Sequence, residues 1–348
     1  MFPISAADSV SPAIQRTKEF LFRPFSWGTY LKLGLVAIVT EGVGSHFQSS
    51  THNDHSSGSG PVIQSLHDLP ALWVAEGVAA VLLLIVISLW LAYLITRLRF
   101  AFFHCLTRNT REIRPGWHLY RPQASRFFWM NVAVGLCFVL LVAVVAAPFA
   151  AGFWQLFQQT QQSGHLNVWL LLSLVLPLIP ILLLLALAAF LADVILRDCM
   201  MPHYALENAT AGQAWSQVRA RIQAEKRQFI VYALLRVALP IVAMAGVFMV
   251  LFVPGLAVAG AFAGILYGIH STFADATGAA AVVGVLIQVF FGVVAFFFFA
   301  LFSICVGGPV STGIREFALI FYGGRYQTLG DMLYPPPPPA IEGTPHTS

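Results

Sequence analysis

Apolar residues occur along this chain in long blocks that are separated by shorter polar ones. The apolar blocks predict helices at about 27–44, 71–95, 127–153, 168–196, 229–253 and 277–306. A helix needs about 20 mainly apolar residues to cross the hydrocarbon layer of a bilayer. The pattern therefore predicts an all-α protein, a polytopic transmembrane helical bundle of about six spans.

Two parts of this pattern are ambiguous. The first span is short and contains Lys32 and Glu41 near its ends, so that Glu41 is expected near the outer face. Pro254 is expected to end the fifth span, and 255–268 then has a glycine every fourth residue from Gly260. Glycines at this spacing suit close helix packing, so this piece is interpreted as a re-entrant or outer-half helix. The sixth span is expected to close at 307–309, which reads Gly-Gly-Pro.

Shorter amphipathic segments flank the spans and divide the chain into three regions. Residues 1–26 form an N-terminal amphipathic segment, 27–333 the transmembrane domain and 334–348 a proline-rich tail that we expect to be disordered. Thr210 and Gln213 have capping-box spacing before a basic amphipathic stretch. We expect such stretches to lie at the cytoplasmic interface.

The distribution of charge fixes the predicted orientation. Charged residues make up only 10% of the chain, against about 25% in soluble domains. The connections placed outside, 45–70, 154–167 and 254–276, contain no lysine or arginine. By the positive-inside rule, this predicts six spans with both termini in the cytoplasm. No basic, apolar and cleavable regions follow one another at the start, so we expect no cleaved signal.

Arginines gather between 97 and 126, where there is no lysine and aromatic residues are interspersed. Guanidinium groups bind phosphate oxygens in pairs, so this stretch suits lipid phosphates or a phosphorylated ligand. The candidate lipid- or phosphate-binding residues are Arg108, Arg111, Arg114 and Arg121. The alternative is that these charges only set topology. We expect no nucleic-acid partner, because the arginines sit beside apolar spans.

Two ionisable residues inside predicted spans form a second candidate site. Asp193 and Arg236 each lie within two helical turns of a cytoplasmic end, in the fourth and fifth spans. Charges in a membrane need partners, so we predict an intramembrane polar pair between them. The alternative is that both side chains reach the interface separately.

Metal chemistry is the remaining candidate, and we expect neither a metal site nor a cofactor. Histidines lie on the predicted outer side at His46, His52, His55, His67, His165 and His270. Imidazoles suit zinc or copper, but the loop lacks the spacing of a known site. The four cysteines form no Cys-x-x-Cys pair and are interpreted as reduced thiols. No P-loop, Gly-x-Ser-x-Gly or His-Glu-x-x-His motif occurs, so we expect no enzyme.

Two basic segments suggest an internal duplication. Arg99 and Trp117 are 18 residues apart, as are Arg197 and Trp215. The two intervals would belong to two helix–loop–helix units in the same orientation. Coincidence, with tryptophan placed at the interface, explains the spacing equally simply.

Several short motifs resemble a family of bacterial multi-pass proteins known only as a domain of unknown function. They are Arg99–Phe103, Thr107–Asn109, Pro115–Trp117, Asp198–Pro202 with Ala214–Trp215, and Gly330–Pro335. His104 departs from this pattern, which has an aspartate at that place. The resemblance implies an integral membrane protein, which we expect in a bacterial inner membrane, and carries no activity. A remoter likeness, to the membrane domain of some glycerophosphodiester phosphodiesterases, implies no enzyme here because the soluble catalytic domain is missing.

These inferences leave three functional classes open. The first is a non-enzymatic accessory or interaction protein, with the bilayer, anionic lipids and other membrane proteins as partners. The second is a transporter or permease for small solutes or lipids, with a site between spans four and five. The third is an intramembrane metal enzyme, which requires the outer histidines to converge.

Overall fold

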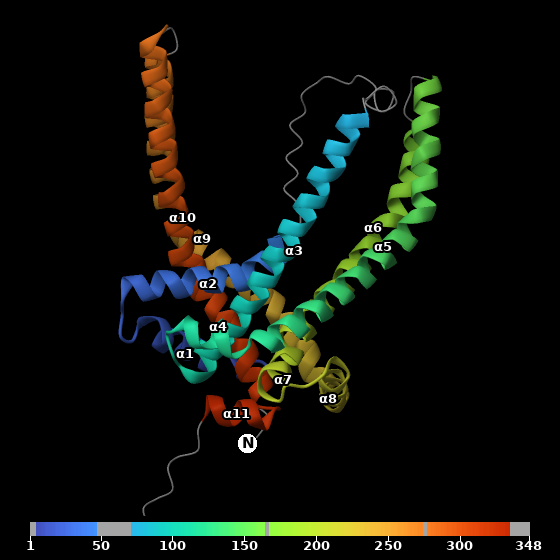
Figure 1. Ribbon diagram of the computed structural model, residues 1–348, viewed down its shortest axis with the longest axis vertical. Coiled ribbons are helices and arrows are strands. Elements are labelled where there is room, and N and C mark those ends of the chain that lie inside the picture. Colours follow the sequence, from blue (N-terminus) through green and yellow to red (C-terminus); the bar gives the residue numbers. More distant parts are fainter. Residues whose placement is uncertain (1–4, 47–70, 164–166, 274–276, 335–348) are drawn as a thin grey trace, which may run out of the picture. The chain divides into compact units, whose positions relative to one another are not determined.

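The computed structural model describes residues 5–46, 71–163, 167–273 and 277–334 (Figure 1). Within these ranges the regular structure is helical and contains no strand, which confirms the all-α prediction. The elements are α1 (Val10–Phe22), α2 (Trp27–His46), α3 (Ala71–Arg108), α4 (Ile113–Leu119), α5 (Arg121–Ser163), α6 (Val168–Val194), η2 (Ile195–Met200), α7 (Met201–Leu206), α8 (Ala211–Ala224), α9 (Lys226–Phe273), α10 (Ala279–Gly323) and α11 (Gln327–Leu333). The predicted proline-rich tail lies outside the described residues, apart from Tyr334.

Five helical stretches are long and apolar enough to cross a membrane. They are Gly77–Arg108, Arg121–Gln162, Val168–Leu206, Lys226–Phe273 and Ala280–Gly323. No residue in the most apolar window of any of them is buried. Helix α2, the predicted first span, is not among the five. The five are drawn from the described residues only, so the first span at 27–44 stays a prediction.

The observed helices are longer than the sequence predicts. Helix α3 continues past 95 to Arg108, so the first part of the arginine-rich stretch is helical. Helix α9 continues through Pro254 to Phe273, which corrects the prediction of a break and a separate piece at 255–268. Helix α10 continues through Pro309 to Gly323, which corrects the predicted end at 307–309. In apolar surroundings a broken helix would leave polar backbone groups unsatisfied, so proline is tolerated inside such helices.

The chain forms two compact units. Unit 1 contains Met1–Ser88, Ala101–Gly116 and Arg227–Ser348, and unit 2 contains Leu89–Phe100 and Trp117–Lys226. In unit 1, α9 and α10 run side by side, and Phe262 of α9 lies 5.8 Å from Phe298 of α10 between ring centroids (Figure 1). We call residues 240–300 the α9–α10 arm. We call the remainder of unit 1 around α1, α2, α11 and the final turns of α10 the base.

Aromatic packing builds the core of the base. Phe317, Phe321 and Tyr322 on α10 are almost fully buried, and so is Tyr232 on α9. The rings of Tyr232 and Phe321 stack with centroids 4.2 Å apart and an interplanar angle of 9°. Burying side chains of this size is the main stabilising contribution available to a small helical core.

Glycines set the crossing of α2 and α10 within the base. A Cβ atom placed on Gly308 would lie 2.7 Å from the Cα of Gly34. Beside this crossing, the hydroxyl of Tyr30 donates a 2.6 Å hydrogen bond to the carbonyl of Cys305. The residues that appeared to end a span are therefore the contact surface for a second helix, as small residues are in membrane helix pairs.

Unit 2 is organised around a π-helical segment. In η2, Arg197, Asp198, Cys199 and Met200 are all buried, and the N–H of Met201 donates to the carbonyl five residues earlier. Pro202 follows directly. It has no N–H, and its ring clashes with the carbonyl four residues before it, which favours a widened turn. Around this segment Phe127 packs edge-on against Tyr204, at 5.3 Å between centroids.

The predicted capping box of α8 is present. The Gln213 side chain accepts a 3.0 Å hydrogen bond from the N–H of Thr210, whose hydroxyl accepts from the N–H of Gln213 at 3.5 Å. Ala214 and Val218 then face inward, while Trp215 is 47% exposed. The prediction of an amphipathic helix after this capping box is therefore confirmed.

Candidate functional site

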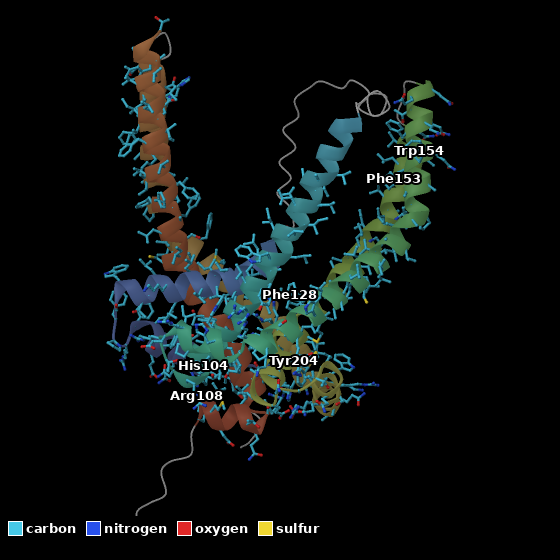
Figure 2. The ribbon with its side chains drawn as sticks, in the orientation of Figure 1. His104, Arg108, Phe128, Phe153, Trp154 and Tyr204 are labelled. Carbon is cyan, nitrogen blue, oxygen red and sulfur yellow. The ribbon has the colours of Figure 1, made fainter. Side chains whose placement is uncertain are left out.

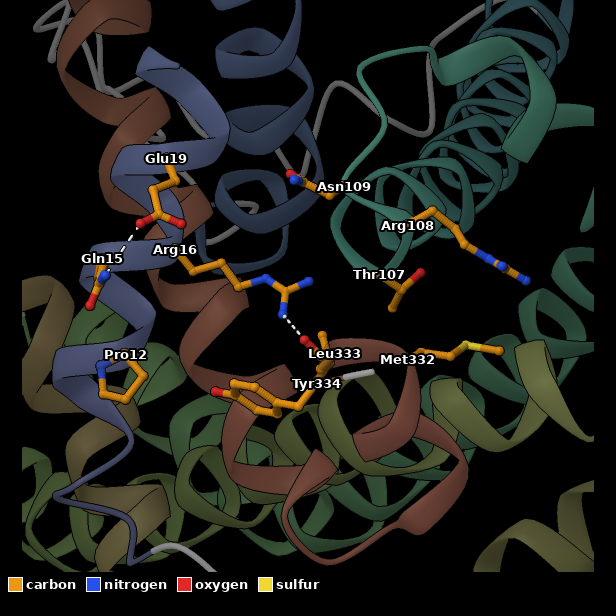
Figure 3. Close-up of a pocket in the computed structure, with 10 residues that line it drawn as sticks. All are labelled: Pro12, Gln15, Arg16, Glu19, Thr107, Arg108, Asn109, Met332, Leu333 and Tyr334. Atoms are coloured by element: carbon orange, nitrogen blue, oxygen red, sulfur yellow. Dashed lines mark hydrogen bonds between the residues drawn. The ribbon is translucent and has the colours of Figure 1, made fainter. Parts of the chain in front are cut away.

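A polar cavity of about 500 Å³ lies within the base of unit 1. Three elements form its walls: α1, the C-terminal turn of α3, and α11 with the residue after it (Figure 3). The lining residues are Pro12, Gln15, Arg16, Glu19, Thr107, Arg108, Asn109, Met332, Leu333 and Tyr334. Two guanidinium groups and one carboxylate therefore border a single cavity.

Arg16 holds the walls of the cavity together. Its Nη1 donates to the carbonyl of Leu333 at 3.0 Å, and its Nη2 donates to the carbonyl of Leu106 at 2.8 Å. Its Nε lies 3.2 Å from Oε2 of Glu316 on α10, a carboxylate with 0% of its side chain exposed. The planar guanidinium can bond in three directions at once, so one residue joins α1, α3, α10 and α11. Arg16 is consequently a positioning residue rather than a free cation.

Arg108 is the second arginine of the cavity, and its environment differs. It is exposed, and among the described residues it donates no hydrogen bond to protein. Figure 3 shows its side chain pointing away from Arg16 along the wall. Next to it, Asn109 has φ 52°, a left-handed conformation that asparagine tolerates and that ends α3 abruptly. The turn thereby leaves Arg108 at the cavity edge, where it can meet an anion from solvent.

Tyr334 and Glu19 complete the polar lining. Burial raises the pKa of the Tyr334 hydroxyl above its usual value; Arg16 opposes this shift and Glu316 adds to it. The hydroxyl therefore stays protonated at neutral pH and can donate a hydrogen bond. Glu19 accepts a 3.2 Å hydrogen bond from Gln15, its neighbour one turn away on α1 (Figure 3).

The other predicted phosphate-binding arginines do not line this cavity. Arg111 donates to the carbonyls of Phe20 at 2.8 Å and Arg23 at 2.5 Å, and also to that of Pro24. It thus satisfies the C-terminal end of α1, where a cation also suits the helix dipole. Arg114 is exposed on α4, and Arg121 is exposed at the start of α5 in unit 2.

Asp193 lies in unit 2 and Arg236 in unit 1, so the predicted pair between them stays a prediction, and each residue has an ion-pair partner within its own unit. Asp193 lies 3.0 Å from Nε of Arg197, one turn along the same segment. Arg236 lies 2.8 Å from Glu41 on α2, and Nε of Arg315 lies 3.9 Å from the same carboxylate. Each charge is therefore neutralised within its own unit.

Glu41 also corrects an expectation about α2. The sequence places Glu41 near the outer face, yet both its arginine partners belong to the basic ends of α9 and α10. Its side chain is 8% exposed, and those of Arg236 and Arg315 are 10% and 4% exposed. A carboxylate between two arginines is stabilised in a buried site, which explains the charges in this short apolar helix. The adjacent Arg315 and Glu316 at the end of a long uncharged helix were the sequence signal for these pairs.

A second polar group lies in unit 2 and centres on His203, which is fully buried. Its Nδ1 lies 3.3 Å from Oε2 of Glu207, and Nη1 of Arg221 lies 3.3 Å from its Nε2. Arginine can only donate, so Nε2 must accept and the proton of a neutral ring resides on Nδ1. Gln217 also donates to Glu207, at 3.1 Å. These contacts connect α7 to α8.

The short family-like motifs have structural explanations. A Cβ atom on Gly116 would lie 2.8 Å from the Cβ of His104 and 2.9 Å from the Cα of Ala101, so only glycine lets α4 approach α3. In unit 2 the guanidinium of Arg97 lies 4.2 Å from the ring centroid of Trp117 and donates to its carbonyl at 2.9 Å. Cation–π stacking thus accounts for part of the interleaved arginines and aromatics.

No group of three or more histidine, cysteine, aspartate or glutamate side chains capable of holding a metal occurs among residues 5–46, 71–163, 167–273 and 277–334. His52, His55, His67 and His165 lie outside these ranges. The proposal of convergent outer histidines therefore gains no support from His270, the outer histidine with a described side chain.

Comparison with known proteins gives one match. The model of a family described as a family of unknown function (DUF7544) matches residues 4–332 of the chain. The comparisons find no match among curated proteins and none among solved structures.

Proposed function

The chain belongs to this family of unknown function, and from its geometry we propose a non-enzymatic accessory or interaction protein of a bacterial inner membrane. In this proposal the five long apolar helices cross the bilayer and the basic helix ends form a cytoplasmic module. The module binds a small ligand with an anionic group in the polar cavity.

The position of the chain ends supports the orientation. Arg16 on α1 and Leu333 on α11 share a 3.0 Å hydrogen bond, so both ends of the described chain lie on the same side. Arginines concentrate at this end of the helices, and by the positive-inside rule it faces the cytoplasm. Toward the other end of α5, Trp154 is 54% exposed and stacks on Phe157, as expected of an aromatic belt (Figure 2). We place α1, α4, α8 and α11 at the cytoplasmic interface.

The observation that carries this proposal is the contrast between the packed base and the unburied α9–α10 arm. The most apolar windows of the five helices have no buried residue, so their surfaces are free to contact lipid or another membrane protein. A permease would instead need helices that enclose a polar path at membrane depth. The only described charges on α9 and α10 that face inward, Arg236, Arg315 and Glu316, are engaged in ion pairs of the base.

The cavity suits an anion with polar substituents, because Arg108 and the Tyr334 hydroxyl both offer donors at its edge. The test is thermal unfolding of the purified protein with inorganic phosphate or glycerol 3-phosphate as the probe. At ten times Kd a ligand stabilises the folded state by about 1.4 kcal/mol. We expect this shift in the natural protein and in Arg114→Gln, which removes an exposed arginine outside the cavity, and its loss in Arg108→Gln. Equal shifts in all three proteins would contradict the cavity assignment.

Orientation has its own test. Because Cys137 is exposed, the four native cysteines are first replaced by serine. Single cysteines at Asp331 on α11 and Gln162 near the outer end of α5, both exposed, can then be labelled with an impermeant maleimide in intact spheroplasts. We expect Q162C to react before lysis and D331C only after it.

Uptake of glycerol 3-phosphate by proteoliposomes would favour the permease over the interaction protein.

A further inference from the structure

Helix α1 borders a second cavity on the face opposite the polar one. This groove has a volume of about 320 Å³ and lies between α1, α9 and α10 of unit 1. It is lined by Val10, Ala13, Ile14, Thr17, Lys18, Phe22, Leu239, Ala243, Pro309, Val310, Gly313, Ile314 and Phe317. The same helix thus presents Gln15, Arg16 and Glu19 to one cavity and an apolar stripe to the other.

The groove offers almost nothing to a polar ligand. The Thr17 hydroxyl donates a 2.7 Å hydrogen bond to the carbonyl of Ala13, so its donor is already engaged within α1. Among the described residues that line the groove, Lys18 is the single charged one. An elongated apolar occupant therefore fits the walls, and its polar end would lie beside the ammonium group.

The surroundings identify that occupant. Leu239, Ala243 and Val310 belong to two of the helices apolar enough to span a bilayer. Neighbouring α9 side chains point outward with large exposed fractions, 62% for Ile241 and 68% for Val242. Such surface is covered by lipid chains when the helices are in a membrane, and Leu239 and Ala243 of the groove lie within two residues of it on α9.

We propose that this groove binds one acyl chain of an anionic phospholipid, with Lys18 contacting the phosphate. Amphipathic helices at the interface commonly combine an apolar contact with a basic residue for the headgroup. Here α1 supplies both, and its attachment to α10 through Arg16 and Glu316 fixes the depth of the site. This site is separate from the polar cavity and does not depend on the ligand proposed there.

Gly313 provides a direct way to fill the groove. A Cβ atom there would meet only the Thr17 Oγ1, at 3.5 Å, so Gly313→Leu adds a side chain to the groove without a backbone clash. Gly292→Leu is the matched control, because that glycine of α10 has nothing within 4 Å and lies outside the groove. Ile14→Asn, at a position 62% exposed, removes apolar contact with little risk to folding.

The experiment is native mass spectrometry of the full chain released from nanodiscs of equal phosphatidylglycerol and phosphatidylcholine. We expect one retained phosphatidylglycerol in the natural protein and in Gly292→Leu, and at least a tenfold loss in Gly313→Leu and Ile14→Asn. Lys18→Gln should lower the preference for phosphatidylglycerol about fivefold, as expected for one basic residue. The control for charge is Arg219→Gln on α8.

Retention in Gly313→Leu and Ile14→Asn equal to that of the natural protein would overturn the proposal. So would an unchanged headgroup preference in Lys18→Gln. A monodisperse elution profile and an unchanged unfolding midpoint for Ile14→Asn ensure that loss of lipid does not reflect loss of fold.

Discussion

Helices α9 and α10 contribute both to the base of unit 1 and to the α9–α10 arm, yet their side chains are buried in the base and exposed in the arm. In the base, Phe317 and Phe321 are almost completely buried, and the ion pairs of Glu316 with Arg16 and of Glu41 with Arg236 join separate helices. In the arm, Phe296 and Phe297 are 69% and 66% exposed although the segment is equally apolar. Hydrophobicity alone therefore does not mark the core of this protein. The core lies where apolar and charged residues occur together, whereas the purely apolar parts are the ones long and apolar enough to cross a membrane.

The largest expected effect compares one phenylalanine from each region. Phe321→Ala removes a buried ring that stacks on Tyr232, and such truncations cost about 3–5 kcal/mol. Phe297→Ala removes an exposed ring, and substitutions of this kind usually stay within about 0.5 kcal/mol. The measurement is the free energy of unfolding in mild detergent. Similar losses for both variants would mean that the arm is packed against protein.

The Arg16–Glu316 pair comes next, since it lies at the centre of the base. Arg16→Met leaves the carboxylate of Glu316 buried without its partner, which should cost about 3–5 kcal/mol in stability. Adding Glu316→Leu to the same chain should recover much of that loss, because a well-packed apolar pair can replace a buried ion pair. Additive losses in the double variant would show that Arg16 acts mainly through its bonds to the Leu106 and Leu333 carbonyls.

These contrasts define how much of the molecule the sequence could predict. The helices, their apolar character and the gathering of arginines at one end follow from local composition. The continuation of α9 through Pro254 and of α10 through Pro309 did not, because proline reads as a breaker unless the apolar surroundings are known.

The ion-pair partners of the buried charges could also not be predicted from the local sequence pattern. Glu41 was expected to be near the outer face, and its pairing with Arg236 and Arg315 depends on the path of α2 across α10. Among the predicted phosphate-binding residues, only Arg108 lines the polar cavity, because Arg111 donates hydrogen bonds to carbonyls at the end of α1. Arginine content indicated the region, whereas the role of each arginine depends on which carbonyls and carboxylates the fold brings near it.

A smaller effect is expected at the crossing of α2 and α10. Gly308→Ala places a methyl group 2.7 Å from the Gly34 backbone, and overpacking of this kind costs about 1–3 kcal/mol. Gly292→Ala in the arm has open space and should be neutral or slightly stabilising, because alanine favours a helix. Unfolding midpoints of the two variants in one detergent provide the comparison. A stable Gly308→Ala protein would indicate that α2 can move away from α10.

The smallest effect should come from Thr210, which caps α8 at the surface of unit 2. Thr210→Ala removes the hydroxyl that caps the first turn of α8, and lost caps of this type cost about 1 kcal/mol. Ser216→Ala is the matched control, because its hydroxyl bonds within the helix to the Gln213 carbonyl and is exposed. Hydrogen–deuterium exchange over 211–224 should rise in Thr210→Ala alone. Equal exchange in both variants would mean that the buried side chains Ala214 and Val218 hold α8 in place without help from its cap. Packing would then outweigh local capping even at the surface of unit 2.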